Sequence, residues 1–240
     1  MPILPSAYRR WSRYLAWPGG LLPGLCHACG QWAWEALCPS CCNDSALHAT
    51  LRCWGCALPT PQPLCIACRE HAPPWALCVA AVTYASPWKE LITAFKFQAQ
   101  AGLADFLAHT MQSNPHIARL VSDCHHVIPV PLSAQRLRER GFNQALLLAK
   151  QLSPQHVLPT GLLRLRDTTA QSGLSRQERL HNLAHAFMVS PTHADVLRQS
   201  KVVLLDDVMT TGATLHACTQ ALLGAGVSRV DIVVLARTPA

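Results

Sequence analysis

The chain places two adjacent acids, Asp206 and Asp207, directly after the apolar run at 201–205 (KVVLL). Such an uninterrupted apolar run predicts a strand that is buried on both faces. Carboxylate oxygens at the end of that strand are hard acceptors, suited to the hydroxyls of a ribose and to the Mg²⁺ that a diphosphate sugar carries. We therefore expect both acids to be catalytic residues of a sugar-phosphate site.

A loop rich in hydroxyl groups follows the acids and leads into a helix predicted at 214–223. Its residues are Thr210, Thr211, Gly212, Ala213 and Thr214. The free N–H groups and the dipole at the start of a helix attract a phosphate dianion, and a glycine lets the backbone approach it closely. We expect this loop to bind the phosphate of a substrate. The competing interpretation is a capped strand-to-helix turn with two solvated aspartates.

A basic segment follows a second predicted strand, at 127–130, and contains Arg140, Asn143 and Gln144. A guanidinium and two amides suit the oxygens of a diphosphate. We assign Arg140 a catalytic role, the stabilisation of charge on a diphosphate leaving group, and we assign Asn143 and Gln144 to substrate binding. The alternative is a basic loop in which Asn143 caps the following helix.

Eight cysteines form two copies of the pattern C-x2-C-x8-C-x2-C. The copies are Cys26, Cys29, Cys38 and Cys41, then Cys53, Cys56, Cys65 and Cys68. Thiolates at this spacing predict two structural Zn²⁺ sites, and four sulfur ligands leave no open position for catalysis. Pairing within each copy follows from the repeat, but pairing across the copies stays open, and Cys42 leaves the ligand set open by one residue. A redox dithiol relay is the rival interpretation.

The remaining pattern predicts the elements that position these residues. Strands are predicted at 78–84, 127–130, 201–205 and 230–236, and helices at 87–97, 103–111, 144–152 and 214–223. Alternating strands and helices indicate an α/β fold with a doubly wound parallel sheet, in which ligands bind at the carboxyl ends of the strands. We expect an N-terminal extension at 1–24, a double zinc-ribbon module at 25–72 and the α/β domain at 73–240.

Charge and composition restrict the class of partner and the compartment. A formal net charge of +7 and a pI near 8.9 favour anionic partners, either nucleic acids or phosphorylated metabolites. The basic start of the chain is followed by prolines and glycines before an apolar core can form, and later apolar runs are interrupted by charges. We therefore expect a reduced, cytoplasmic protein without membrane insertion.

Six tryptophans precede or begin the α/β domain, at Trp11, Trp17, Trp32, Trp34, Trp54 and Trp75. Indole rings can stack on the bases of a single strand of nucleic acid. Packing against the small zinc modules is an equally simple interpretation.

The stretch at 203–214 resembles the phosphoribosyl-diphosphate loop of type I phosphoribosyltransferases. The stretches at 95–97, 130–144 and 171–187, together with the cysteine repeat, resemble the ComF family over nearly the whole chain after Leu25. This resemblance implies a type I phosphoribosyltransferase-like fold that binds 5-phosphoribosyl diphosphate with Mg²⁺. It also implies a role in DNA uptake, natural transformation or the use of external DNA, with single-stranded DNA and uptake or recombination proteins as partners.

The polar segment at 164–182 resembles the mobile loop that covers the site in phosphoribosyltransferases. The resemblance makes Gln171, Arg176 and Arg179 substrate-binding residues, whereas the alternative is a solvated basic face. We also place Lys96 among the substrate-binding residues. Its alternative is a lysine whose stem lies between two core phenylalanines.

Three functions remain compatible with these patterns. A transferase would displace Mg-diphosphate from the ribose C1 through a transition state with oxocarbenium character, and the acids and arginines would supply electrostatic preorganisation. A single-stranded DNA-binding protein would use a regulatory or vestigial phosphoribosyl site. A partner-docking protein of an uptake assembly would use the zinc modules. No feature of the sequence selects the acceptor of a transferase.

Overall fold

The computed structural model describes residues 23–44, 51–97, 100–165 and 186–239. Its centre is a four-stranded sheet in the order β3-β8-β7-β4, and every neighbouring pair in it is parallel. The strands are β3 (Leu77–Thr83), β4 (His126–Pro129), β7 (Lys201–Met209) and β8 (Arg229–Arg237). All four strands predicted from the sequence are present, and the α/β fold class with a parallel sheet is confirmed.

The two central strands carry the most apolar sequence because both of their faces are covered. Residues 202–205 of β7 and 230–236 of β8 are all buried. Strand β7 stays paired with β8 as far as Met209, which lies opposite Arg237. The strand is thus four residues longer than the predicted 201–205, so Asp206 and Asp207 lie within it.

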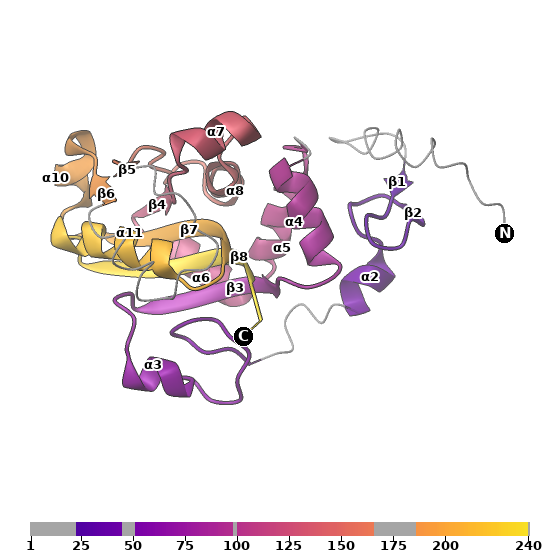
Figure 1. The fold of residues 1–240 in the computed structure, drawn as a ribbon, viewed down its shortest axis with the longest axis horizontal. Helices are drawn as coiled ribbons and strands as arrows, with labels where there is room; N and C mark the ends of the chain where they lie inside the picture. The colour runs from indigo at the N-terminus through magenta and orange to yellow at the C-terminus, as the bar shows by residue number, and fades with distance from the viewer. Residues whose placement is uncertain (1–22, 45–50, 98–99, 166–185, 240) are drawn as a thin grey trace.

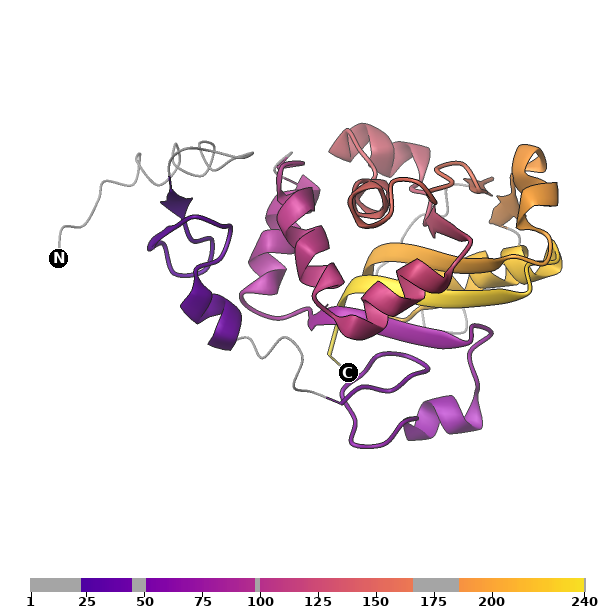
Figure 2. The same cartoon turned by 180° about the vertical axis from the view of Figure 1, so that it is seen from behind.

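Helices cover both faces of the sheet. The helices of this domain are α4 (Trp88–Phe97), α5 (Leu103–Gln112), α6 (Pro115–Asp123), α7 (Ala134–Arg140), α8 (Gln144–Leu152), α10 (Ala194–Leu197) and α11 (Ala213–Gly224), with a 3-10 turn η1 (Pro191–His193) before α10. Figure 1 shows α11 in front of the sheet, and Figure 2, from behind, shows α6 in front of it. The helices α6, α7 and α10 were not predicted from the sequence.

Two apolar cores lie on the two sides of the sheet. Helices α4, α5 and α8 pack on the side of β7 that carries Val203 and Leu205. Helix α11 packs on the side that carries Val202 and Leu204. A separate antiparallel pair, β5 (Leu162–Arg164) and β6 (Phe187–Val189), joins the core on the α11 side.

Each cysteine repeat forms a small module that contacts a different part of the sheet domain. The first cysteine module, residues 24–44, contains β1 (Gly24–Leu25), β2 (Trp32–Ala33) and α2 (Pro39–Asp44). Its buried Leu37 belongs to the same core as α4 and α5. The second cysteine module, residues 51–71, contains α3 (Ile66–Glu70) and lies beside β3 (Figure 1). Its buried Ala57 belongs to the core on the α11 side.

Among the described residues, every helix is too short or too polar to cross a lipid bilayer.

Candidate functional site

Residues 210–214, which are the turn after β7 and the first two residues of α11, are called the phosphate loop below. Gly212 precedes the helix with φ +77°, a left-handed conformation that glycine adopts without a steric penalty. A Cβ at this position would lie 2.7 Å from Met209 Cε and 3.6 Å from Trp75 Cη2. Thr211 Oγ1 accepts a hydrogen bond from Ala213 N at 3.4 Å. The left-handed backbone angle is the reason that this position favours glycine, and a Cβ would in addition displace the flexible end of Met209.

The two acids of β7 differ in their surroundings. Neighbouring side chains on a strand point to opposite faces, so Asp207 shares the face of Val203 and Leu205, and Asp206 shares that of Val202 and Leu204. Asp207 Oδ1 lies 3.1 Å from Lys96 Nζ and Asp207 Oδ2 lies 4.0 Å from Arg140 Nη1. All three of these side chains are largely buried. The negative charge of Asp207 is thus balanced by two cations.

Among the described residues, Asp206 has no such ion pair. Its Oδ1 accepts a hydrogen bond from Asp207 N at 2.8 Å. Burial and the neighbouring Asp207 charge raise the pKa of Asp206 well above the usual range of a carboxyl group, although that hydrogen bond, Lys96 and Arg136 oppose the rise. A carboxylate in this position becomes more stable when a cation binds beside it, and a divalent metal ion is a suitable counter-charge.

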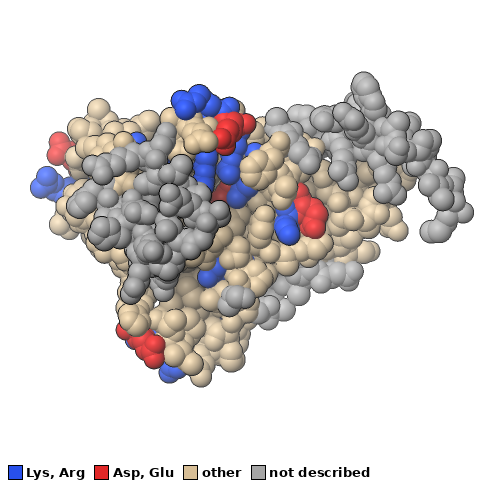
Figure 3. Space-filling model, in the orientation of Figure 1, with Lys and Arg blue, Asp and Glu red and all other residues tan. Residues whose placement is uncertain are grey.

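Arg140 lies at the centre of the basic side of the site. Its Nη1 donates a hydrogen bond to Gln144 Oε1 at 3.0 Å, and its guanidinium carbon lies 5.1 Å from the centre of the Phe97 ring. Gln144 is 1% exposed, yet its Nε2 has no hydrogen-bond partner among the described residues. A buried amide donor without an acceptor favours a ligand oxygen at this point. Figure 3 shows Lys and Arg side chains gathered between α7 and α4 on this face.

Asn143 takes the role that the sequence analysis kept as the alternative. Its Oδ1 caps α8 by accepting a hydrogen bond from Leu146 N at 3.3 Å, and its Nδ2 donates to Val130 O at 3.0 Å. Both ends of the amide thus hold the start of α8 against the end of β4. This position sets the direction of the neighbouring Gln144.

The structure brings together the acids, Lys96, Arg140 and Gln144 beside the phosphate loop. The alternative interpretation of Lys96 fails in part, because Phe95 is buried but Phe97 is 68% exposed. The aromatic contact of Phe97 with Arg140 was missed, since a sequence pattern does not show that two distant helices meet.

The predicted lid residues Gln171, Arg176 and Arg179 lie outside the described residues. Arg164, which begins the same polar segment, lies in β5 with its guanidinium carbon 5.3 Å from the centre of the Phe187 ring. A hydrogen bond of 2.8 Å from Leu165 N to Ala186 O holds together the two residues that flank 166–185.

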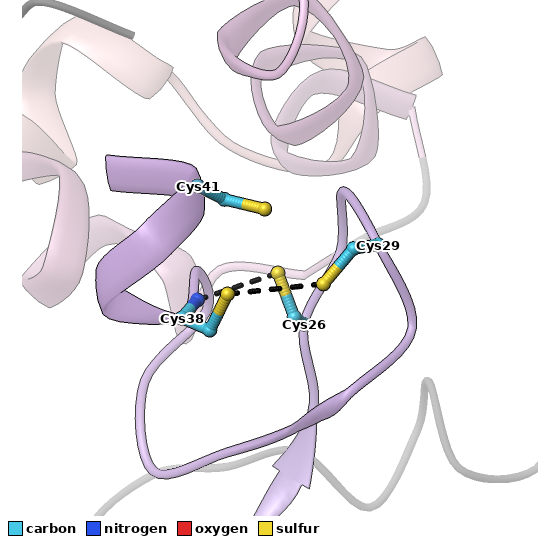
Figure 4. Close-up of side chains that lie close together, drawn as sticks. All are labelled: Cys26, Cys29, Cys38 and Cys41. Carbon is cyan, nitrogen blue, oxygen red and sulfur yellow. Dashed lines mark hydrogen bonds between the residues drawn. The ribbon is translucent and has the colours of Figure 1, made fainter. Parts of the chain in front are cut away.

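The eight repeated cysteines form two groups, one in each module. The first group is Cys26, Cys29, Cys38 and Cys41, and the second is Cys53, Cys56, Cys65 and Cys68, with the sulfur atoms of each group all within 4.8 Å of one another. Figure 4 shows the first group, in which Cys41 lies in α2, Cys38 lies directly before this helix, and Cys26 and Cys29 come from the preceding loop. The groups follow the pairing within each copy of the repeat, and Cys42 belongs to neither.

The spacing and the polarity of each group fit a tetrahedral Zn²⁺ ion. Cys29 and Cys38 have sulfur atoms 3.7 Å apart, as do Cys56 and Cys65. Zn–S bonds of about 2.3 Å in a tetrahedron give an S···S distance of about 3.8 Å. The sulfur of Cys53 also accepts hydrogen bonds of 3.3 Å from the backbone N–H groups of Gly55 and Cys65.

Hydrogen bonds from backbone N–H groups to the cysteine sulfurs favour the thiolate, which is the form that binds zinc. Burial raises the pKa of Cys26, but hydrogen bonds from the backbone of Cys29, Cys38 and Ala28 outweigh it and lower the pKa to about 6. Hydrogen bonds with the sulfurs of Cys38 and Cys29 raise the pKa of Cys41. The first group therefore accepts one negative charge easily and further charges only with a cation among them.

Comparisons with known proteins agree with the fold. Residues 142–240 match the phosphoribosyl transferase domain family. The chain is 30% identical to the DNA utilization protein YhgH of Salmonella typhimurium over 233 residues, covering 90% of this chain and 98% of that protein. It is 34% identical to competence protein F of Haemophilus influenzae over 179 residues, covering 72% and 78%. It is 35% identical to competence protein ComFC of Bacillus subtilis over 139 residues, covering 57% and 54%.

The two acids should respond in opposite ways to neutralisation. Because the pKa of Asp206 is higher in the folded protein, the folded protein binds a proton at this carboxyl group more tightly than the unfolded chain does. The free energy of unfolding therefore falls as the pH rises from the ordinary pKa of an aspartate to about 7. We expect Asp206→Asn to remove this pH dependence and to increase the free energy of unfolding at pH 8 by about 1–2 kcal/mol. Urea unfolding of the wild type and the variant at several pH values measures both effects on the free energy of unfolding.

The matched variant Asp207→Asn should decrease the free energy of unfolding at pH 8 by about 1–3 kcal/mol, because Lys96 and Arg140 lose their partner. Equal effects of the two variants at every pH would contradict this assignment of charges.

Metal analysis of the purified protein should find two zinc ions per chain, one for each cysteine group. We expect Cys53→Ser to reduce the content to one ion, because it removes a thiolate from the second group. Cys42→Ser is the matched control and should leave both ions in place, since Cys42 lies outside the groups. Loss of an ion in the control would show that Cys42 is a ligand.

Proposed function

This chain belongs to the ComF family, and from that premise we propose that it binds 5-phosphoribosyl diphosphate with Mg²⁺ and acts in the uptake or use of external DNA. The observation that carries the ligand assignment is the pair Asp206 and Asp207 in β7, next to the glycine-dependent phosphate loop and opposite Lys96 and Arg140. Acids, an anion-binding loop and cations serve the three chemical parts of this ligand, which are a ribose, a 5'-phosphate and a diphosphate.

Each part of the ligand has a complementary group in the site. The phosphate loop offers hydroxyls and the N-terminal N–H groups of α11, a helix of 12 residues, to the 5'-phosphate. Asp206 and Asp207 accept hydrogen bonds from ribose hydroxyls. Arg140 and the unsatisfied Nε2 of Gln144 suit diphosphate oxygens. Lys96 can exchange its contact with Asp207 for a contact with the ligand.

The acids also suit the metal ion that accompanies a diphosphate. Mg²⁺ prefers oxygen ligands from one or two carboxylates together with substrate phosphates, and it supplies positive charge that stabilises the diphosphate. Asp206 fits this role because its carboxyl group is partly buried and lacks an ion pair among the described residues.

In the transfer reaction that we propose, the bond between the ribose C1 and the diphosphate oxygen breaks, and C1 forms a bond to a nucleophilic atom of an acceptor. The diphosphate leaves with the electron pair of the broken bond. Arg140 stabilises the charge that grows on it, and the acids hold the ribose in a fixed orientation. The proposal needs no covalent intermediate with the protein.

We also keep the predicted division into an extension at 1–24, a double zinc-ribbon module at 25–72 and a phosphoribosyltransferase-like domain at 73–240. We propose a cytoplasmic location, because cysteines that bind zinc must stay reduced and the cytoplasm is a reducing compartment.

Single-stranded DNA binding is a second candidate function, and the exposed tryptophans favour it. Trp32 and Trp34 of the first module and Trp54 of the second are 66%, 67% and 59% exposed. Tryptophan side chains that serve packing are highly buried on average, whereas these three rings are mostly exposed. Trp75 and Trp88, by contrast, are buried at 7% and 2% exposure and serve the core.

Titration calorimetry with Mg²⁺ and 5-phosphoribosyl diphosphate tests the main proposal. We expect micromolar binding that weakens by at least about tenfold in Asp207→Asn, which is a loss of about 1.4 kcal/mol. Asp231→Asn is the matched control, because Asp231 is a carboxylate of β8 that pairs with Arg229 at the opposite end of the sheet. Absence of binding by the folded, zinc-loaded wild type would refute the ligand assignment.

Fluorescence anisotropy with a labelled oligothymidylate tests the second candidate. Replacing Trp32 and Trp34 together by alanine should weaken binding by about tenfold or more, since each base stacked on an aromatic ring contributes about 1–3 kcal/mol. Ile66→Ala removes an apolar side chain of similar exposure, 66%, from the second module and should leave binding unchanged. Equal losses in both variants would argue against stacking.

A further inference from the structure

The second cysteine module contacts the residues that shape the phosphate loop. Arg237, at the end of β8, is 7% exposed and extends its guanidinium between them. Its Nε donates a hydrogen bond to Cys56 O at 2.8 Å, and its Nη1 donates one to Met209 O at 3.0 Å. One rigid, planar group thus joins the backbone of a cysteine in the second group to the last residue of β7, directly before the loop.

Trp75 makes a second connection between the same two parts. Its Nε1 donates a hydrogen bond to Gly55 O at 2.7 Å, within the turn between Cys53 and Cys56. The far edge of its ring, at Cη2, lies 3.6 Å from the position of a Cβ on Gly212. Trp75 is 7% exposed and belongs to the same packed core as Met209 and Ala213, which lie on either side of the turn at 210–212.

A cavity of about 190 Å³ lies between the cysteine group and the loop. Cys65, Cys68, Thr211 and Arg237 are among the residues that line it. Beside this cavity, Ala57 of the module and Trp75 pack in the same core as Met209, so the hydrogen bonds of Arg237 and the packing of Trp75 both cross this region.

The first cysteine module differs in this respect. Its buried Leu37, Cys26 and Cys38 belong to the core on the other side of the sheet, with α4 and α5. The second module also has an anchor that does not involve the loop, because Arg52 Nη2 donates a hydrogen bond of 2.7 Å to Thr83 Oγ1 in β3. A variant of the first module therefore loses a cysteine group without losing a contact to the loop, and a variant of Arg237 loses the contact while Arg52 still holds the second module to β3.

We propose that Arg237 and Trp75 are positioning residues that couple the second cysteine group to the phosphate loop, so that zinc binding there and phosphoribosyl ligand binding strengthen each other. The ligand half of this coupling rests on the proposed function. The connection between the module and the loop does not. Because coupling between two binding sites is reciprocal, a ligand on the loop slows the loss of zinc from the second group and leaves the first group unaffected.

Hydrogen–deuterium exchange tests the connection without any ligand. We compare backbone exchange in residues 206–216 among the zinc-loaded wild type, Arg237→Lys and Cys68→Ser, with Cys29→Ser of the first group as the matched control. Lysine keeps the charge but replaces the planar fork, whose two nitrogens each reach one carbonyl, by a single nitrogen on a flexible stem. We expect exchange in the loop to become about tenfold faster in the first two variants and to stay at the wild-type rate in the control.

Unchanged loop exchange in Arg237→Lys and Cys68→Ser would overturn the proposal. So would equal acceleration in the Cys29→Ser control, because the effect would then reflect a general loss of structure. Circular dichroism and zinc content identify a variant that has unfolded, and the retained Arg52 anchor makes Arg237→Lys the milder of the two changes.

Release of zinc to a colorimetric chelator tests the reciprocal effect. With Mg²⁺ and 5-phosphoribosyl diphosphate present, one of the two zinc ions should leave the wild type about tenfold more slowly, and this difference should vanish in Arg237→Lys. Calorimetric binding of the ligand without any change in zinc release would reject the coupling. Absence of ligand binding in calorimetry would instead reject the proposed function, and the exchange experiment would still decide the connection.

Discussion

The ion pair between Asp207 and Lys96 is the interaction on which the arrangement of the site depends. It joins a central strand to α4, and Arg140 at the end of α7 completes the charge balance. A buried ion pair is costly to form and more costly to break, because the remaining charge stays in a poorly solvated place. The three elements are therefore held in one orientation around the carboxyl end of β7. Asp206, without such a pair among the described residues, keeps its charge available for a cation or a ribose.

Both cysteine modules pack against the sheet domain that carries this site. Each module places buried side chains in a core of the sheet domain, the first beside α4 and α5 and the second on the α11 side. Short cysteine-rich segments lack an apolar core of their own and need a metal as a staple. Because the second module touches Met209 through Arg237, the staple and the phosphate loop share a mechanical connection.

The sequence placed most directly those parts of the candidate site that lie within one continuous stretch. The acids, the hydroxyl-rich loop and the start of α11 are adjacent in the chain, so their types and order already indicated an anion site. The end of β7 was predicted too early, because Asp206 and Asp207 are poor strand formers by composition. Pairing with β8 as far as Arg237 overrides that preference. Helix α7 was also missed, since its residues include no buried side chain and thus no apolar period.

The sequence by itself determined the parallel α/β fold, the two groups of four cysteines and the position of the phosphate loop, because apolar period, ligand spacing and turn chemistry are local properties. Only the tertiary structure decided which charges meet. Lys96, Arg140 and Asp207 come from three elements far apart in the chain, and their contacts depend on how α4 and α7 pack beside β7. The same holds for Arg237, whose hydrogen bond to Cys56 joins residues separated by 181 positions. Side-chain packing sets such distances, and packing is a property of the whole fold.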